Sequence, residues 1–121
     1  MSHGYRLLTI DRHGNAAFVR LTHARLDENE VYELFGELLD LAREDGAIRI
    51  ALSLGPQTPD CMYSVFLAKL ISLQRRLREM GGGLKLCECT PQVLDILDAT
   101  ALRDFFDLVP DHATARQQWG V

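Results

Sequence analysis

Three stretches in the first half of the chain show the residue alternation of strands. YRLLTIDR (5–12) and AAFVRL (16–21) flank the turn-forming HGN (13–15), and this arrangement predicts a β-hairpin. IRIALSL (48–54) alternates large apolar residues with small or polar ones, so one face of that strand is apolar. Strands covered on both faces tend to be apolar throughout. We therefore expect helices to cover mainly one face of the sheet.

Between the hairpin and the third strand, the apolar residues follow a helical period. They recur three or four positions apart and would form one face of a helix: Val31, Leu34, Phe35, Leu38, Leu39 and Ala42. Asp27 and Glu30 have the spacing of a capping box, in which each side chain accepts a hydrogen bond from the other residue's backbone N–H. Gly46 suits the end of a helix. The sequence predicts a helix that begins after Asp27 and stops before Gly46.

A second helix is expected after the loop GPQTP (55–59). It starts between residues 60 and 64 and runs to about residue 79. Its apolar stripe consists of Met62, Phe66, Leu70, Leu73, Leu77 and Met80. GGG (81–83) follows a helix and precedes a strand, which is the reverse of a phosphate-binding loop, so it predicts a helix cap and a tight turn.

The remaining elements follow in the same alternation. LKLCE (84–88) predicts a strand, and Thr90 and Pro91 open a third helix as its cap and first residue. A short edge strand is expected at 106–109, and Asp111 caps a last helix.

This order of elements predicts an α/β fold with a mixed sheet of four to five strands, an N-terminal β-hairpin and about four helices. Strands separated by helices imply right-handed crossovers and a partly parallel sheet. The 121 residues fit one compact domain spanning 1–121.

Composition excludes several classes of function. The formal net charge is −4 and no basic stripe is present, so nucleic-acid binding is not supported. No apolar run has the length of a membrane span, and the N-terminus lacks the pattern of a secretion signal. Three cysteines, an odd number, fit a reducing compartment. We expect a cytoplasmic protein without membrane insertion.

Three ordered stretches carry a resemblance to a known family. VRLTHARLDENEVYELFGELLDLARED (19–45) resembles its strand, "G-x-L-D" turn and first helix. LAKLISLQRRLREMGGGLKLCECTPQVLDIL (67–97) resembles its next helix, Gly-Gly turn and strand, and ATALRDFFDLVPDHATA (99–115) resembles its ending. The chain is thus similar to the STAS domain family, named for sulfate transporters and anti-sigma factor antagonists, and above all to its stand-alone bacterial antagonists.

The resemblance implies a regulatory site at the start of the second helix. In the family this start usually has the residues Asp-Ser-Ser-Gly-Leu, and the second serine accepts a phosphate from a kinase that is also the anti-sigma partner. Phosphorylation breaks the contact between the two proteins. If Leu67 sets the register, Tyr63 takes the Asp position, Ser64 the first Ser position, Val65 the acceptor position and Phe66 the Gly position.

In this register the acceptor is lost, because valine has no hydroxyl. Ser64 is the alternative acceptor, but it would reach that place only by pulling the leucine pattern out of line, and serine is also an ordinary helix cap. Phe66 is either an exposed partner anchor or a core residue of the apolar stripe. The hypothesised partner-binding residues are Asp60, Tyr63, Ser64, Val65 and Phe66.

Other candidate chemistry is weaker. Cys87 and Cys89 lie two apart in a strand-like stretch and should point the same way, which would allow a metal site with Cys61 or a histidine. Buried, inert cysteine is the commoner state, so we expect no metal and no other cofactor. Four aspartates are expected to form a solvated acidic face: Asp95, Asp98, Asp104 and Asp107. No catalytic motif is present, and we do not expect an enzyme.

We therefore expect a non-catalytic, regulatory protein-interaction domain that resembles an anti-sigma factor antagonist. Its contact surface would be the loop and helix start at 55–67, together with the 22–28 turn. The partner would be an anti-sigma factor kinase or another STAS protein, and a homodimer stays open. One alternative is a STAS regulatory subunit of a transporter ATPase or other assembly. Another is a small-ligand-binding STAS domain with a pocket on the polar sheet face or at the 55–63 loop.

Overall fold

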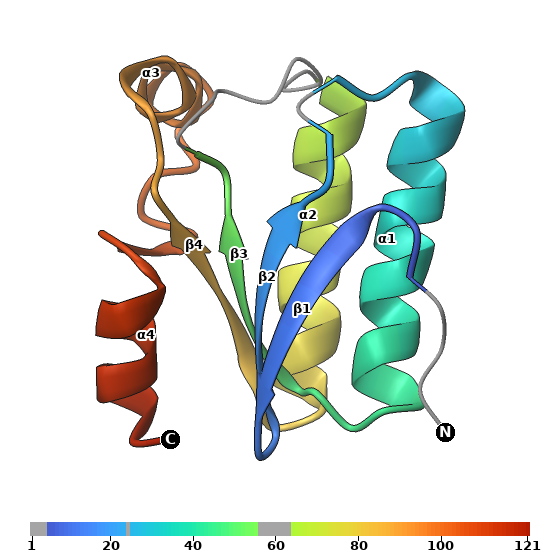
Figure 1. Ribbon diagram of the computed structural model, residues 1–121. Helices are drawn as coiled ribbons and strands as arrows, with labels where there is room; N and C mark the ends of the chain where they lie inside the picture. Colours follow the sequence, from blue (N-terminus) through green and yellow to red (C-terminus); the bar gives the residue numbers. More distant parts are fainter. Residues whose placement is uncertain (1–4, 24, 56–63) are drawn as a thin grey trace.

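The structure is a computed structural model in which residues 5–23, 25–55 and 64–121 are described. Its strands are β1 (Leu8–His13), β2 (Ala16–Leu21), β3 (Arg49–Ser53), β4 (Gly83–Cys87) and β5 (Asp107–Val109). Its helices are α1 (Glu28–Arg43), α2 (Ser64–Glu79), α3 (Pro91–Ala99) and α4 (His112–Trp119). The elements follow the order expected from the sequence (Figure 1). None of the helices in the described part of the chain combines the length and apolarity needed to cross a membrane.

The strands form one mixed sheet in the order β1-β2-β3-β4-β5. β1 and β2 are antiparallel and form a hairpin, in which Leu8 lies opposite Leu21. All other neighbouring strands are parallel. The predicted α/β architecture, with its N-terminal hairpin and mixed sheet, is confirmed.

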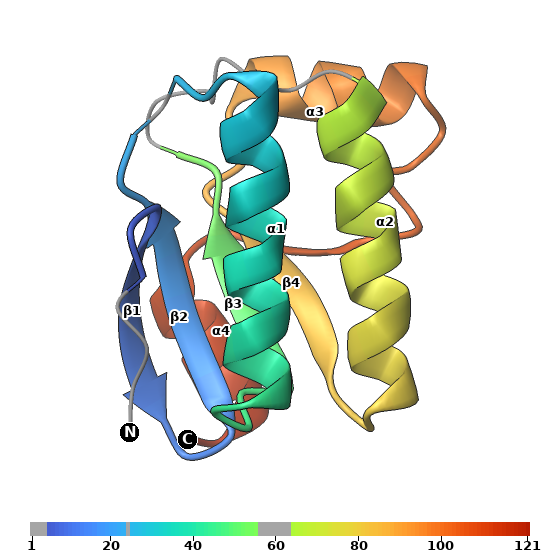
Figure 2. The same ribbon diagram turned by 90° about the vertical axis from the view of Figure 1, so that its right-hand side faces the viewer.

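Helices α1 and α2 lie side by side on one face of the sheet, and α3 crosses the upper end (Figures 1 and 2). The strands follow one another in space as they do in the sequence, so every parallel crossover steps in the same direction. Right-handed crossovers that step in one direction place their helices on one face. The main core fills the space between these layers and includes Leu34, Ile50, Leu52, Leu84 and Leu86.

The opposite face of the sheet is partly covered by the short helix α4, so the helices lie mainly, but not only, on one face (Figure 1). Phe18, Ala51 and Cys87 point to this side and form a second, smaller apolar cluster with Ala115 of α4. The small side chain of Ala51 lets the helix approach the strands closely. Because α4 has only eight residues, polar side chains of the same face such as Arg20 stay partly exposed.

The helix starts follow their sequence signals. Asp27 and Glu30 form the predicted capping box: the carboxylate of Asp27 accepts from Glu30 N at 2.8 Å, and Glu30 accepts from Asp27 N at 3.2 Å. Thr90 and Asp111 cap α3 and α4, as expected. These contacts satisfy donors that a helix start otherwise leaves unpaired.

Candidate functional site

The start of α2 and the carboxyl ends of β2, β3 and β4 lie at the same end of the molecule, the upper end in Figure 1. In open α/β sheets this end is the usual place for a site. Of the residues suggested by the sequence, Asp60 and Tyr63 lie outside the described residues, and so does the side chain of Ser64. Their roles stay predictions. Val65 and Phe66 are described: Val65 is partly exposed, whereas Phe66 is buried.

Phe66 is a core residue. Its exposed fraction is 0%, and its ring meets that of Phe35 edge-on, with centroids 5.3 Å apart. It shares the buried face of α2 with Leu70 and Leu73. The alternative in which Phe66 is an exposed partner anchor does not hold, because its burial against α1 leaves no surface for a partner.

Val65 packs against the core but keeps part of its side chain accessible. It is the second residue of α2, within the turn whose backbone N–H groups have no partner inside the helix. Residues 64–67, the described start of α2, carry no acidic side chain. The positive end of the helix dipole is therefore not offset by carboxylates of its own turn. Val65 itself has no hydroxyl and cannot accept a phosphate.

Three side chains from neighbouring strands form a hydrogen-bonded group at this end of the sheet. Arg20 lies near the end of β2, Ser53 ends β3, and Glu88 follows β4. Arg20 Nη1 is 2.5 Å from Glu88 Oε1 and 3.1 Å from Ser53 Oγ. The Ser53 hydroxyl donates to Glu88 Oε1 at 2.6 Å. The sequence pattern did not indicate this group, although each member is a polar residue at the end of a largely apolar strand.

The backbone of Glu88 lies directly against Gly55, at the beginning of the connection from β3 to α2. Its φ is 55°, in a region that few residues other than glycine adopt. Residue 55 must be glycine at this close approach, because a Cβ there would lie 2.2 Å from the Glu88 carbonyl oxygen. Partial burial opposes ionisation of Glu88, but hydrogen bonds from Ser53 and Arg20 outweigh it and lower its pKa. Glu88 is therefore a carboxylate that ties three strand ends together.

His112 is a polar group whose place the sequence did not indicate. Its Nε2 is buried and has no hydrogen-bond partner among the described residues. Burial lowers the pKa of His112, the charge of Arg20 lowers it further, and Glu88 opposes this only in part. The ring meets Phe18 edge-on at 5.6 Å and lines a shallow hollow of about 270 Å³ on the polar face of the sheet.

Cys87 and Cys89 point to different sides of the sheet, contrary to the expectation that they share one. Cys87 belongs to the cluster under α4, whereas Cys89 packs against the main core. The positive φ of Glu88 between them interrupts the alternation of an extended strand. Burial raises the pKa of Cys87 to about 12 and that of Cys89 to about 11, so both stay protonated at neutral pH. Nowhere in the described residues do three potential ligands gather for a metal ion.

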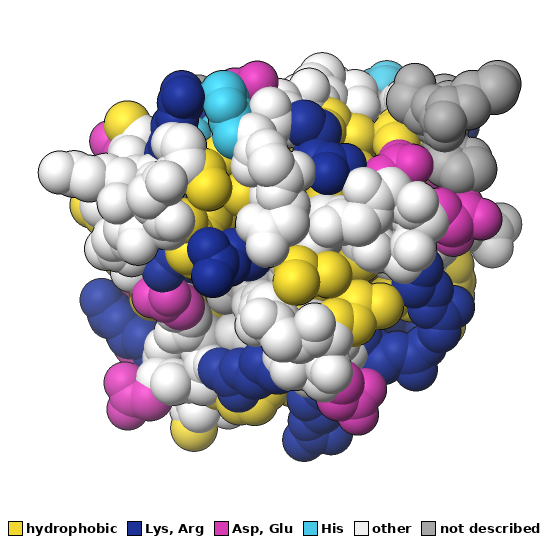
Figure 3. All heavy atoms as spheres, turned by 90° about the horizontal axis from the view of Figure 1, so that it is seen from below, with side chains coloured by type: hydrophobic (Ala, Val, Ile, Leu, Met, Phe, Trp, Pro, Cys, Tyr) yellow, Lys and Arg dark blue, Asp and Glu magenta, His cyan; other side chains and the backbone are white. Residues whose placement is uncertain are grey.

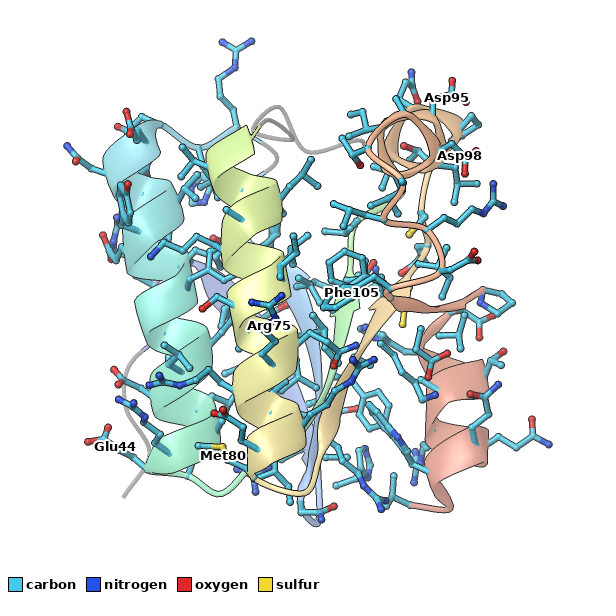
Figure 4. All side chains as sticks on the ribbon, turned by 180° about the vertical axis from the view of Figure 1, so that it is seen from behind. Glu44, Arg75, Met80, Asp95, Asp98 and Phe105 are labelled. Atoms are coloured by element: carbon cyan, nitrogen blue, oxygen red, sulfur yellow. The ribbon has the colours of Figure 1, made fainter. Side chains whose placement is uncertain are left out.

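The aspartates of the C-terminal third do not form one solvated face. Asp95 and Asp98 lie on α3 (Figure 4), and Asp98 pairs with Arg103 at 3.0 Å. Asp107 lies on β5 and forms an ion pair with Lys85, whose side chain is only 9% exposed. The expected acidic face is thus divided between separate elements, and Asp107 has a structural partner.

The fold resembles that of several solved structures. No protein-family model and no curated protein sequence matches the chain. Among solved structures, an anti-sigma-factor antagonist (STAS) domain protein from Planctomyces limnophilus is similar, with a TM-score of 0.73 and 16% identity, over 94% of this chain and 98% of that one. The chain has the STAS fold.

Two further STAS-like structures support this result. The unphosphorylated form of the anti-sigma factor antagonist SpoIIAA has a TM-score of 0.74 and 14% identity, over 94% of this chain and 97% of its own. A candidate anti-sigma factor antagonist from Thermotoga maritima has a TM-score of 0.77 and 16% identity, over 94% and 95% of the two chains. At these identities the likeness concerns the STAS fold and not the chemistry of individual residues.

Proposed function

We propose that the protein is a regulatory STAS domain that acts by protein–protein contact, as an anti-sigma factor antagonist, and that the usual phosphate acceptor is missing from it. The docking surface would be the accessible side chains of the loop and helix start at 55–67, without the buried Phe66, together with the 22–28 turn. The partner would be an anti-sigma factor kinase or another STAS protein in the cytoplasm. The observation that carries the proposal is the partly exposed Val65 in the first turn of α2.

The chemistry of Val65 supports a contact that is not switched by phosphate. SpoIIAA is described in an unphosphorylated and a phosphorylated form. A phosphate adds up to about two negative charges and disrupts an apolar contact by repulsion and desolvation. An isopropyl group in the first turn of α2 offers an apolar surface that cannot acquire this charge. The resulting contact would be constitutive.

Described residues around the start of α2 hold this helix and the neighbouring strand ends together. Phe66 anchors α2 to α1 from below, and the group of Arg20, Ser53 and Glu88 holds the strand ends together. A helix start that is fixed in this way loses less conformational entropy on binding than a mobile one.

Two other functions would use the same fold. A regulatory subunit of a transporter ATPase or another assembly would use the same surface with a different partner. A small-ligand-binding domain would use the hollow beside His112 and Arg20. The identity of the bound partner separates the first of these from our proposal.

The test uses the purified protein and the anti-sigma factor kinases encoded in the same genome, with affinity measured by isothermal titration calorimetry. Val65→Asp is expected to weaken binding at least about tenfold, because an unpaired charge would be desolvated in the contact. Ser72→Asp places the same charge on the exposed side of α2, well beyond the first turn. It is the matched control and is expected to bind like the unaltered protein.

Phosphate transfer is followed in the same mixtures by mass spectrometry after addition of ATP. The unaltered protein is expected to remain unmodified, and Val65→Ser is expected to gain one phosphate. Phosphate on Ser64 of the unaltered protein, with release of the partner, would overturn the assignment of the acceptor position. Unchanged binding by Val65→Asp would place the docking surface elsewhere.

A further inference from the structure

A second site lies at the other end of α2, where this helix turns into β4. A hollow of about 310 Å³ opens there. The side chains and turn that line it include Arg49, Arg78, Lys85, Asp107, Trp119 and the glycines 81–83. Because α2 has 16 residues, this end is about 24 Å from the helix start discussed above. Figure 3 looks onto this end of the molecule and shows basic side chains among exposed apolar atoms.

The charges around the hollow do not balance. Three cationic side chains face one carboxylate, in a protein whose net charge is −4. Lys85 is already engaged, because it pairs with Asp107 and donates to Gln118 Oε1 at 2.8 Å. Two guanidinium groups remain, those of Arg49 and Arg78. Across the described residues neither of them forms an ion pair.

The two arginines belong to different elements. Arg49 begins β3 and is half-buried, and its backbone N–H donates to Asn15 O at 3.1 Å. Arg78 lies in the last turn of α2, with its guanidinium 5.3 Å from the centroid of the Phe105 ring. Its Nη2 is 3.4 Å from the carbonyl oxygen of Phe105, a long contact. Contacts with the described residues leave most guanidinium donors of Arg49 and Arg78 available to a ligand.

The glycines shape the hollow but do not supply its donors. Gly81 N donates to Arg78 O and Gly82 N to Leu77 O, which is the pattern of a Schellman helix end. Gly83 N donates to Ile48 O. All three amides are used internally, so any anion would be bound by the arginine side chains. This agrees with the prediction that the glycine run is a turn and not a phosphate loop.

We propose that this hollow binds a small organic phosphate, held by Arg49 and Arg78. The guanidinium fork matches the geometry of phosphate oxygens and remains charged at every physiological pH. The volume lies at the lower end of the range of roughly 300–1,000 Å³ found for small-molecule sites, which leaves room for a group attached to the phosphate. Trp119 forms an aromatic part of the wall. This site is independent of the protein contact proposed for the start of α2.

The chain contains its own reporter for this site, because Trp119 is the only tryptophan. The test follows the fluorescence of Trp119 while glycerol 3-phosphate or inorganic phosphate is added at constant ionic strength. We expect a saturable change with glycerol 3-phosphate. Arg49→Gln and Arg78→Gln are each expected to raise the half-saturation concentration about tenfold, since each removes charged hydrogen bonds to the phosphate.

Arg75→Gln is the matched control, because Arg75 lies on the same helix but on its outward, exposed face (Figure 4). It is expected to titrate like the unaltered protein. A response that sodium chloride reproduces, or an equal loss in Arg75→Gln and Arg49→Gln, would overturn the proposal. Circular dichroism checks that each variant is folded, and Arg49→Gln is the more informative one because Arg78 also touches Phe105.

Discussion

Replacement of Phe66 by alanine tests whether the start of α2 is anchored from inside. Phe66 has an exposed fraction of 0% and lies edge-on against Phe35, so alanine would leave a cavity between α1 and α2. A contact residue on the surface would behave differently, because its truncation would affect binding and leave the free protein nearly as stable.

The expected loss of stability is large. Truncation of a buried phenylalanine to alanine costs about 3–5 kcal/mol, from lost apolar burial and the remaining cavity. The value should lie in the upper part of that range, since the edge-to-face contact with Phe35 contributes about 0.5–1.5 kcal/mol beyond its area. Small domains are stable by only about 5–15 kcal/mol. Because 1 kcal/mol shifts the midpoint of thermal unfolding by about 3–6 °C in a domain of this size, the midpoint should fall by roughly 12–30 °C.

The assay is urea denaturation of Phe66→Ala and of Val65→Ala, its matched control one residue earlier. Val65 is only partly buried, and its truncation is expected to cost about 1 kcal/mol. If Phe66→Ala costs less than this control while the slope of the unfolding curve is unchanged, the side chain is not part of the core and our account of the helix start is wrong.

Two further predictions concern the polar end of the sheet. Gly55→Ala is expected to destabilise the protein by about 1–3 kcal/mol, because the added Cβ would collide with the Glu88 carbonyl oxygen. Gly36→Ala in α1 is the control, because its added Cβ would have no atom within 4 Å, and it should stabilise the protein by about 0.5–1 kcal/mol in the same urea assay. Equal effects of the two variants would contradict the close approach of Gly55 to Glu88. The pKa of His112 is lowered on folding by burial and by Arg20, so below about pH 6.5 the unfolded state binds more protons and stability falls as the pH drops. The loss of unfolding free energy from about pH 7.5 to about pH 5.5 should be smaller in His112→Gln than in the unaltered protein, and an equal loss would show that His112 is not the group responsible.

The sequence by itself determined the kind and order of the elements. Periodicity and capping residues are local signals, and α1 shows why they suffice: its apolar spacing and its Asp27 capping box depend only on residues within the helix. The direction of the crossovers follows from chirality, which also needs no long-range information. The start of α2, where the sequence proposes the candidate site, could be predicted for the same reason, since it is the start of a helix after a strand.

Only the tertiary structure decided what these positions face. The pattern of α2 left Phe66 open between core and surface, and contact with Phe35 of α1 settled it. The group of Arg20, Ser53 and Glu88 joins residues more than 30 positions apart in the sequence, and Arg49 and Arg78 meet at one hollow from different elements. Such groups depend on strand register and on single backbone angles such as the positive φ of Glu88. A one-dimensional pattern does not encode these features, because they arise from packing between segments distant along the chain.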